Sequence, residues 1–184
     1  MGIEDTPNYQ SQYFWIGHDK YNRRDEAHVM SDVDWIHKYS SNLGPEKLPR
    51  FIIPNPLTGK PAPRANGVGQ SYACDNAVKE ARHIIVEFDN LPMTDQLAFV
   101  GGVLNSGTMK VVSVVHSGNK SLHLLVRVED DYNTFRTRLQ RYICSAPDPR
   151  HRADAAVLHT ASLTRLAGAL RPDTGNLQYL LYAN

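Results

Sequence analysis

Two short polar motifs, each set on an apolar run, constrain the fold of this chain most strongly. Glu87 and Asp89 end one apolar run, and Ser121 and His123 begin another. Side chains alternate between the two faces of a β-strand, so each polar pair projects from one face while its apolar neighbours project from the other. The sequence therefore predicts a sheet with an apolar face and a polar face that gathers two acids, a hydroxyl and an imidazole.

The acid pair favours a site for divalent cations. Glu87 and Asp89 lie about 7 Å apart along an extended strand, a spacing that lets both carboxylates share or bridge hard cations. Oxygen ligands suit Mg²⁺ or Mn²⁺, and substrate phosphates can complete the coordination shell.

The hydroxyl and imidazole belong to segment 117–123, with the sequence SGNKSLH, between two apolar runs. Its glycine allows a tight turn whose backbone N–H groups can face an anion. Lys120 adds a positive charge, and Ser121 and His123 can donate hydrogen bonds to phosphate oxygens. The segment lacks the sequence of a P-loop and indicates a hairpin that forms a phosphate cradle.

These motifs resemble the archaeo-eukaryotic primase superfamily, in particular the primase-polymerases of plasmids, phages and mobile elements. The resemblance covers roughly residues 80–175. It rests on the acid-x-Asp motif, on the Ser-x-His string, and on Asp154 followed by an Arg- and Leu-rich segment at 163–171. Ala167 and Gly168 stand where many relatives have Pro-Gly.

The resemblance implies an α+β fold, with an RRM-like antiparallel sheet that has helices on one face and is joined to an N-terminal α/β unit. It implies a DNA primase or primase-polymerase that joins nucleotides during DNA replication by a two-metal mechanism. The metals, Mg²⁺ or Mn²⁺, would be held by Glu87, Asp89 and Asp154.

The resemblance also implies the partners of the site. Ser121 and His123 would contact the triphosphate of the incoming nucleotide, and Lys120 and Arg165 are further candidate phosphate ligands. The substrates would be (d)NTPs on a single-stranded DNA template. Any helicase would lie on another part of the protein or on a partner. The choice between ribo- and deoxynucleotides stays open.

Length and charge bound the organisation of the chain. At 184 residues it predicts one domain, with an N-terminal part at 1–75, including a proline-rich loop at 45–63, and a metal- and nucleotide-binding core at 76–184. The net charge is only +1, but residues 136–171 hold seven arginines and two acids. This distribution predicts a local basic wall on a phosphate-binding face.

Other sequence features exclude several classes of protein and of metal site. Cys74 and Cys144 stand in unrelated contexts, so neither a disulfide framework nor a Cys-ligated zinc site can be built. No signal peptide or long apolar run is visible, so a cytoplasmic protein without membrane contact is expected. The apolar stretch 179–182 close to the last residue suggests a catalytic domain excised from a longer protein.

The apolar periodicity of the core predicts the order strand, helix, hairpin, helix, strand. The predicted ranges are 83–89, 94–105, 111–116 with 121–128, 132–145, and closing strands at 155–158 and 177–182. Upstream, the pattern predicts a strand at 13–16, a helix from the N-cap Ser31 to Gly44, and a short helix capped by Asp75. Six prolines forbid regular structure through most of 45–63.

Three alternatives to a nucleotidyltransferase stay open. A metal-dependent nuclease or replication initiator could use the same acids, although a rolling-circle nickase would show two histidines flanking one apolar residue, whereas His123 is followed by two leucines. A non-catalytic nucleic-acid-binding module of RRM type would present stacking aromatics, and run 121–128 has none. A primase-derived protein without activity is disfavoured because all three acids are present.

Overall fold

The computed structural model describes residues 11–21, 23–40 and 43–184. Within these residues the chain forms an α+β fold in which all strand pairs are antiparallel. The α+β class predicted from the sequence is therefore confirmed. No helix in this part of the chain combines the length and apolarity needed to span a membrane.

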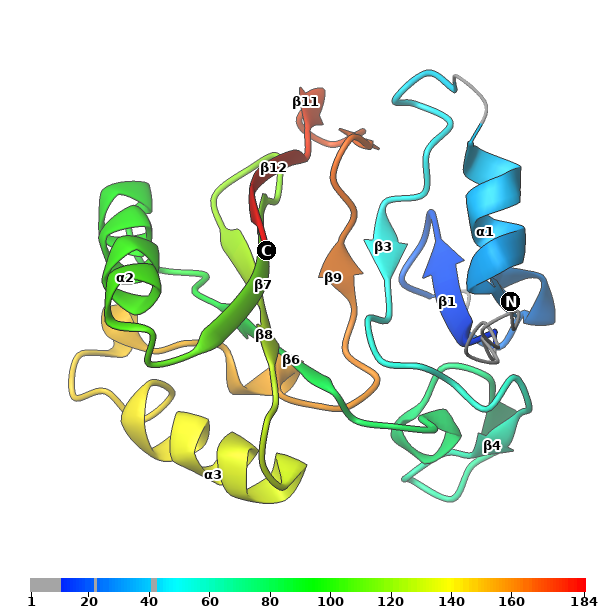
Figure 1. The fold of residues 1–184 in the computed structure, drawn as a ribbon, viewed down its shortest axis with the longest axis horizontal. Coiled ribbons are helices and arrows are strands. Elements are labelled where there is room, and N and C mark those ends of the chain that lie inside the picture. The colour runs from blue at the N-terminus through cyan, green and yellow to red at the C-terminus, as the bar shows by residue number, and fades with distance from the viewer. Residues whose placement is uncertain (1–10, 22, 41–42) are drawn as a thin grey trace, which may run out of the picture.

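A four-stranded core sheet carries both polar motifs. Its strands, in the order β12-β7-β8-β6, are β12 (Tyr179–Ala183), β7 (Lys110–His116), β8 (Leu122–Arg127) and β6 (His83–Glu87). The helices α2 (Met93–Ser106) and α3 (Tyr132–Tyr142) pack against this sheet (Figure 1). Alternate residues of β6 and β8, among them Ile84, Val86 and Leu124, are buried against Val100 of α2 and Leu139 of α3.

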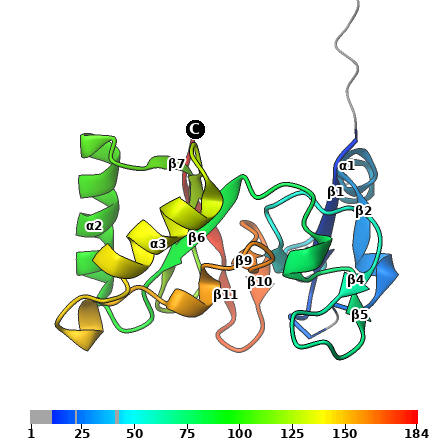
Figure 2. The same cartoon turned by 90° about the horizontal axis from the view of Figure 1, so that it is seen from below.

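A second four-stranded sheet, here called the N-terminal sheet, has the order β2-β1-β3-β9. Its strands are β1 (Tyr13–Gly17), β2 (Val29–Ser31), β3 (Phe51–Ile52) and β9 (Thr164–Arg165), and the helix α1 (Asp32–Tyr39) follows β2 directly. Because β9 comes from late in the sequence, it joins the C-terminal part of the chain to the N-terminal sheet. In both Figure 1 and Figure 2, β9 lies between the core sheet and the N-terminal elements.

Short elements connect these sheets. Two hairpins pair β4 (Ala62–Pro63) with β5 (Gln70–Ser71) and β10 (Leu170–Arg171) with β11 (Asn176–Leu177). Single turns of 3-10 helix lie at η1 (Glu26–His28), η2 (Asp75–Ala77), η3 (Pro149–His151) and η4 (Ala155–Val157). The proline-rich stretch 45–63 therefore contains two short strands, β3 and β4, and is otherwise irregular.

Most predicted elements form, with shifted ends. Ser31 caps α1 by accepting a hydrogen bond from the backbone N–H of Asp34, as predicted, but the helix ends at Tyr39 rather than near Gly44. Part of the predicted extension, residues 41 and 42, lies outside the described residues. Gly107 ends α2 in the left-handed conformation with a φ of 63°, which glycine adopts without steric cost.

Two predictions of local structure are wrong, and in both cases the error concerns which donors a carboxylate accepts hydrogen bonds from. The segment predicted as a strand at 155–158 is the 3-10 helix η4, because the Asp154 carboxylate accepts a hydrogen bond from the Ala156 N–H and caps it. Asp75 does not cap the helix that follows it. Its Oδ1 instead accepts hydrogen bonds from Thr160 and Ala161, 85 and 86 residues further along the chain.

Asn55 joins the N-terminal part to the core through a complete set of hydrogen bonds. Its side chain is 1% exposed. The Nδ2 group donates to the carbonyls of His83 and Thr160, at 2.8 Å each. Oδ1 accepts from the N–H groups of Arg82 and His83 at 2.8 and 2.7 Å. All four bonding positions of the amide are therefore used, and they fix the start of β6.

We predict that Asn55→Leu destabilises the protein by about 3–5 kcal/mol, because four buried backbone groups lose their partner. Asn105→Leu, at an exposed position of α2, is the matched control and should change stability by no more than about 0.5 kcal/mol. Urea unfolding followed by circular dichroism measures both. Equal midpoints for the two variants would show that Asn55 does not hold the two parts together.

Candidate active site

Glu87 is the centre of the polar face of the core sheet. The antiparallel register of β6 and β8 sets Glu87 opposite His123. The Ser121 hydroxyl donates to Glu87 Oε1 at 2.8 Å, and His123 Nε2 lies 3.2 Å from the same oxygen. Only 13% of the Glu87 side chain and 6% of the His123 side chain are exposed. The structure thus unites one acid of the first motif with both polar residues of the second.

The orientation of the His123 ring is fixed from both sides. An ionised carboxylate only accepts hydrogen bonds, so Nε2 must carry the hydrogen that it donates to Glu87. The other ring nitrogen, Nδ1, lies 3.4 Å from the Thr164 hydroxyl of β9. Thr164 is 6% exposed. This end of the polar face is therefore covered by β9.

The turn before Ser121 is held by a buried glutamine. Gln96 of α2 is 1% exposed, donates to the Lys120 carbonyl at 2.9 Å, and accepts from the Leu122 N–H at 2.8 Å. These two backbone groups flank Ser121. Gln96 also donates to the Leu91 carbonyl at 2.7 Å, just after the acid motif. One side chain therefore fixes the relative position of the two motifs.

Gly118 gives the predicted hairpin its tight turn. Its φ is 75°, and a Cβ at this position would come within 3.1 Å of the Leu177 carbonyl oxygen. The Gly118 carbonyl accepts hydrogen bonds from the side chains of Thr174 and Asn176 in the β10-β11 hairpin. A larger residue would push that hairpin away, so glycine is required for both conformation and space.

The surroundings of Glu87 favour its ionised form. Burial by itself would raise its pKa, but hydrogen bonds from His123 and Ser121 and the positive charge of Arg165 outweigh burial and hold the pKa of Glu87 below the ordinary 4.5. A carboxyl with a lowered pKa stabilises the fold above its ordinary pKa, and this stabilisation is lost as the pH falls through the folded-state value.

We predict that Glu87→Gln lowers stability by about 1–2 kcal/mol at pH 6 in buffer with EDTA, because charge-assisted hydrogen bonds are weakened. The difference from the wild type should shrink as the pH is lowered below 4.5. Thermal unfolding at a series of pH values measures this effect, with the half-exposed Glu129→Gln as control. A pH-independent difference between the two proteins would contradict the charged state assigned to Glu87.

Asp89 lies beyond the end of β6, at the exposed margin of the site. Its carboxylate is 3.6 Å from the Lys120 Nζ, and these side chains are 49% and 58% exposed. An ion pair so exposed contributes little stability. Its effect is to keep a carboxylate and a lysine, one from each motif, beside each other at the mouth of the turn.

Asp154 reaches the site through its backbone. Its N–H donates to the Glu87 carbonyl at 2.8 Å, so the chain passes directly beside the end of β6. Its carboxylate accepts from the Ala156 N–H at 2.8 Å. Burial, and after it the charge of Asp154, raise the pKa of the Cys144 thiol. The role of Asp154 as a third metal-facing acid stays a prediction.

The donor set fits a cation that also binds substrate. Glu87 uses Oε1 for both of its donors, and in the described part of the chain Oε2 has no hydrogen-bond partner. Mg²⁺ in nucleotide sites commonly binds one or two carboxylates and takes its other ligands from phosphate and water. Across residues 11–21, 23–40 and 43–184, no three Asp, Glu, His or Cys side chains are grouped to hold a metal by themselves. Phosphate oxygens would have to complete the shell.

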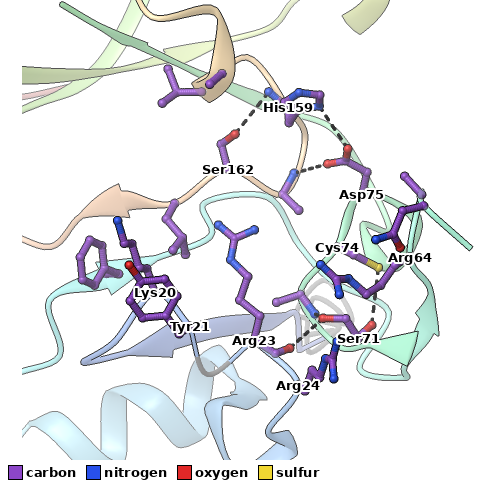
Figure 3. A pocket seen from close by; sticks show the side chains of 18 of the residues that line it. Lys20, Tyr21, Arg23, Arg24, Arg64, Ser71, Cys74, Asp75, His159 and Ser162 are labelled. Carbon is purple, nitrogen blue, oxygen red and sulfur yellow. Dashed lines mark hydrogen bonds and ion pairs between the residues drawn. The ribbon is translucent and has the colours of Figure 1, made fainter. Parts of the chain in front are cut away.

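Glu87, His123 and Arg165 line one cavity of about 960 Å³. Five Lys or Arg residues and two acids line it: Lys20, Arg23, Arg24, Arg64, Arg165, Asp75 and Glu87. Figure 3 shows Arg23 extending into this cavity, with Arg64 and Arg24 near it and the pair His159 and Asp75 on another side. We call Lys20, Arg23, Arg24 and Arg64 the cationic wall.

The cationic wall differs from the basic wall that the sequence predicts. Of the seven arginines at 136–171, only Arg165 lines the cavity. Others make local contacts: Arg138 with Asp130 at 3.7 Å and Arg150 with Asp148 at 2.7 Å. The cationic wall comes from the segment after β1 and from the loop between β4 and β5. The cluster of Lys20, Arg23 and Arg24 just after an aromatic strand was the signal that could have revealed it.

Among solved structures, the chain is similar to the AEP domain of the primase-polymerase of cyanophage S-2L. The identity is 16%, the TM-score is 0.49, and the match covers 95% of this chain and 81% of that chain. No family model and no curated protein matches the sequence. The geometry of the site, rather than this likeness, supports the function proposed below.

Proposed function

We propose that this chain is the catalytic domain of a template-directed nucleotidyltransferase, a DNA primase or primase-polymerase with an RRM-like core. The observation that carries the proposal is that Glu87, held by Ser121 and His123, lines a cavity otherwise dominated by cations. An ionised acid beside an excess of positive charge is what a metal-bound nucleoside triphosphate and a nucleic-acid strand require in one place.

Each residue has a distinct task in this proposal. Ser121 and His123 orient Glu87, to which both donate in the free protein, and contact with the triphosphate would require these donors to pass from Glu87 to phosphate oxygens. Lys120 adds a mobile positive charge there, and Arg165 adds a planar one. Because Ser121 and His123 are positioned by backbone pairing and by Gln96 before substrate arrives, little ordering of this part of the site is needed on binding.

Glu87 and Asp89 would hold the divalent cation, with Asp154 as the proposed third acid. Two bound Mg²⁺ or Mn²⁺ ions would activate the attacking 3′-hydroxyl and stabilise the triphosphate and the leaving pyrophosphate. Asp89 is well placed for exchange with solvent because half of its side chain is exposed.

The cationic wall suits the template strand. Arg23 is half-buried, and burial lowers its pKa, while the charge of Asp75 raises it. No side-chain hydrogen bond of Arg23 to another described residue is found. Phosphodiester groups of a single-stranded DNA template would supply the missing acceptors, across the cavity from the triphosphate site.

We predict that Asp89→Ala lowers primer extension at least about a hundredfold while the fold stays intact, because a carboxylate at the metal contributes mainly to the chemical step. The assay extends a labelled primer on a DNA template with Mg²⁺ or Mn²⁺. Asp95→Ala, on α2 and away from the cavity lining, is the control and should extend like the wild type.

The same assay separates the alternatives. Shortening of the labelled strand in place of extension would indicate the nuclease. Strand binding without any metal-dependent reaction would indicate the non-catalytic module. Normal extension by a folded Asp89→Ala variant would remove Asp89 from the metal site.

We predict that Arg23→Ala and Arg64→Ala each weaken binding of single-stranded DNA about three- to tenfold at low salt and reduce the slope of log affinity against log salt by about 0.7. Fluorescence anisotropy with a labelled oligonucleotide measures both quantities. Arg138→Ala, at an exposed position of α3, is the matched loss of charge and should leave affinity within about twofold. Equal losses of affinity in all three variants would mean that DNA binding depends only on the net charge of the protein.

A further inference from the structure

Phe51 and Arg165 form a cross-strand pair where the N-terminal sheet meets the cavity. The register of β3 and β9 sets Phe51 opposite Arg165, and the guanidinium carbon lies 4.3 Å from the centre of the ring. Both residues line the cavity that contains Glu87 and His123. At this distance the cation is in direct contact with the negative face of the aromatic ring.

The Phe51 ring is itself held in place. It packs on the buried apolar cluster of the N-terminal sheet, which includes Trp15, Ile53 and Leu57. Phe51 is neither part of the predicted metal site nor a donor to phosphate. Its fixed position nevertheless makes it the surface on which the Arg165 guanidinium rests.

Among the residues that the structure describes, Arg165 has no acceptor for its donors. Its Nε–H is buried and has no hydrogen-bond partner among the described residues. Burial, and after it the like charge of Arg171, lower the pKa of Arg165 to about 10, so the group remains charged at neutral pH. A half-buried cation whose buried donor is unused is unfavourable unless an anion reaches it. An acceptor in the cavity would supply what the protein does not.

We propose that Phe51 is a positioning residue that holds the Arg165 guanidinium ready to bind the polyphosphate of the incoming nucleotide. Stacking occupies one flat face of the guanidinium and leaves its N–H edges free for phosphate oxygens. The inference rests on the proposed function, since it assigns the ligand of Arg165 to the nucleotide site. It also means that β3, from the N-terminal part, contributes to the nucleotide affinity of a site built mostly from the core.

The test is a double-mutant cycle on Phe51 and Arg165. The variants are Phe51→Leu, which removes the ring, Phe51→Tyr, which keeps it, Arg165→Met, and the double variant Phe51→Leu with Arg165→Met. Titration calorimetry measures affinity for a deoxynucleoside triphosphate and for tripolyphosphate. Primer extension gives kcat and KM. Phe99→Leu, in the ring pair of Phe99 with Phe88 outside the cavity lining, controls for lost stability.

Phe51→Leu should weaken affinity for both anions about tenfold and raise KM by the same factor, with kcat within about threefold. Phe51→Tyr should stay within about twofold of the wild type. In the Arg165→Met background, Phe51→Leu should cause no further loss, because the ring then has no Arg165 guanidinium to hold, and Arg50, 6.0 Å from the ring centre, does not line the cavity. Phe99→Leu should lower the Tm without changing affinity.

Additive losses in the double variant, or unchanged affinity in Phe51→Leu, would overturn the inference. So would a wild-type protein that binds neither anion. A wild-type protein that binds tripolyphosphate in a manner dependent on Phe51, yet extends no primer, would overturn the proposed function and leave the positioning role of Phe51 standing.

Discussion

The antiparallel register between β6 and β8 is the constraint on which the rest of the structure depends. It pairs Glu87 with His123 and, on the same strands, Val86 with Leu124. The first pair faces the cavity and the second lies in the core. A slip of one residue would bury the acid in the apolar core and expose the valine, so the hydrophobic effect that stabilises the sheet also fixes the chemistry of the site.

The second requirement is that distant segments meet at the end of β6. Asn55 brings the loop after β3 to His83 and Thr160, and β9 brings Thr164 to His123. Each of these contacts satisfies a buried polar group, so each would be costly to lose. The polar face is consequently assembled from three parts of the chain, and its geometry is set by strand pairing and by buried side chains such as Asn55 and Gln96.

The positive charges in the cavity lower the stability of the free protein, as is common at a binding site. The cationic wall and Arg165 gather positive groups that repel one another, and Arg165 leaves a buried donor unpaired. Such an arrangement costs stability in the free protein and is compensated when anions bind. Glu87 is the exception, since Ser121 and His123 stabilise its negative charge before any cation arrives.

Local patterns in the sequence determined the parity of the two motifs, the hairpin between them, and most helices and strands. Strand alternation and the demand for an apolar face act over a few residues, so they can be read directly. They were sufficient to predict that Glu87, Ser121 and His123 would share one face. They also predicted the capping of α1 by Ser31 and the end of α2 at Gly107.

Only the tertiary structure decided which distant groups share the cavity. The seven arginines at 136–171 suggested a single basic wall, but only Arg165 lines the cavity, and the other cations come from the segment after β1 and the loop before β5. Asp75 and Asp154 were open to several partners, because a carboxylate accepts hydrogen bonds equally well from nearby and remote N–H groups. Long-range packing made that choice, and no local pattern records it.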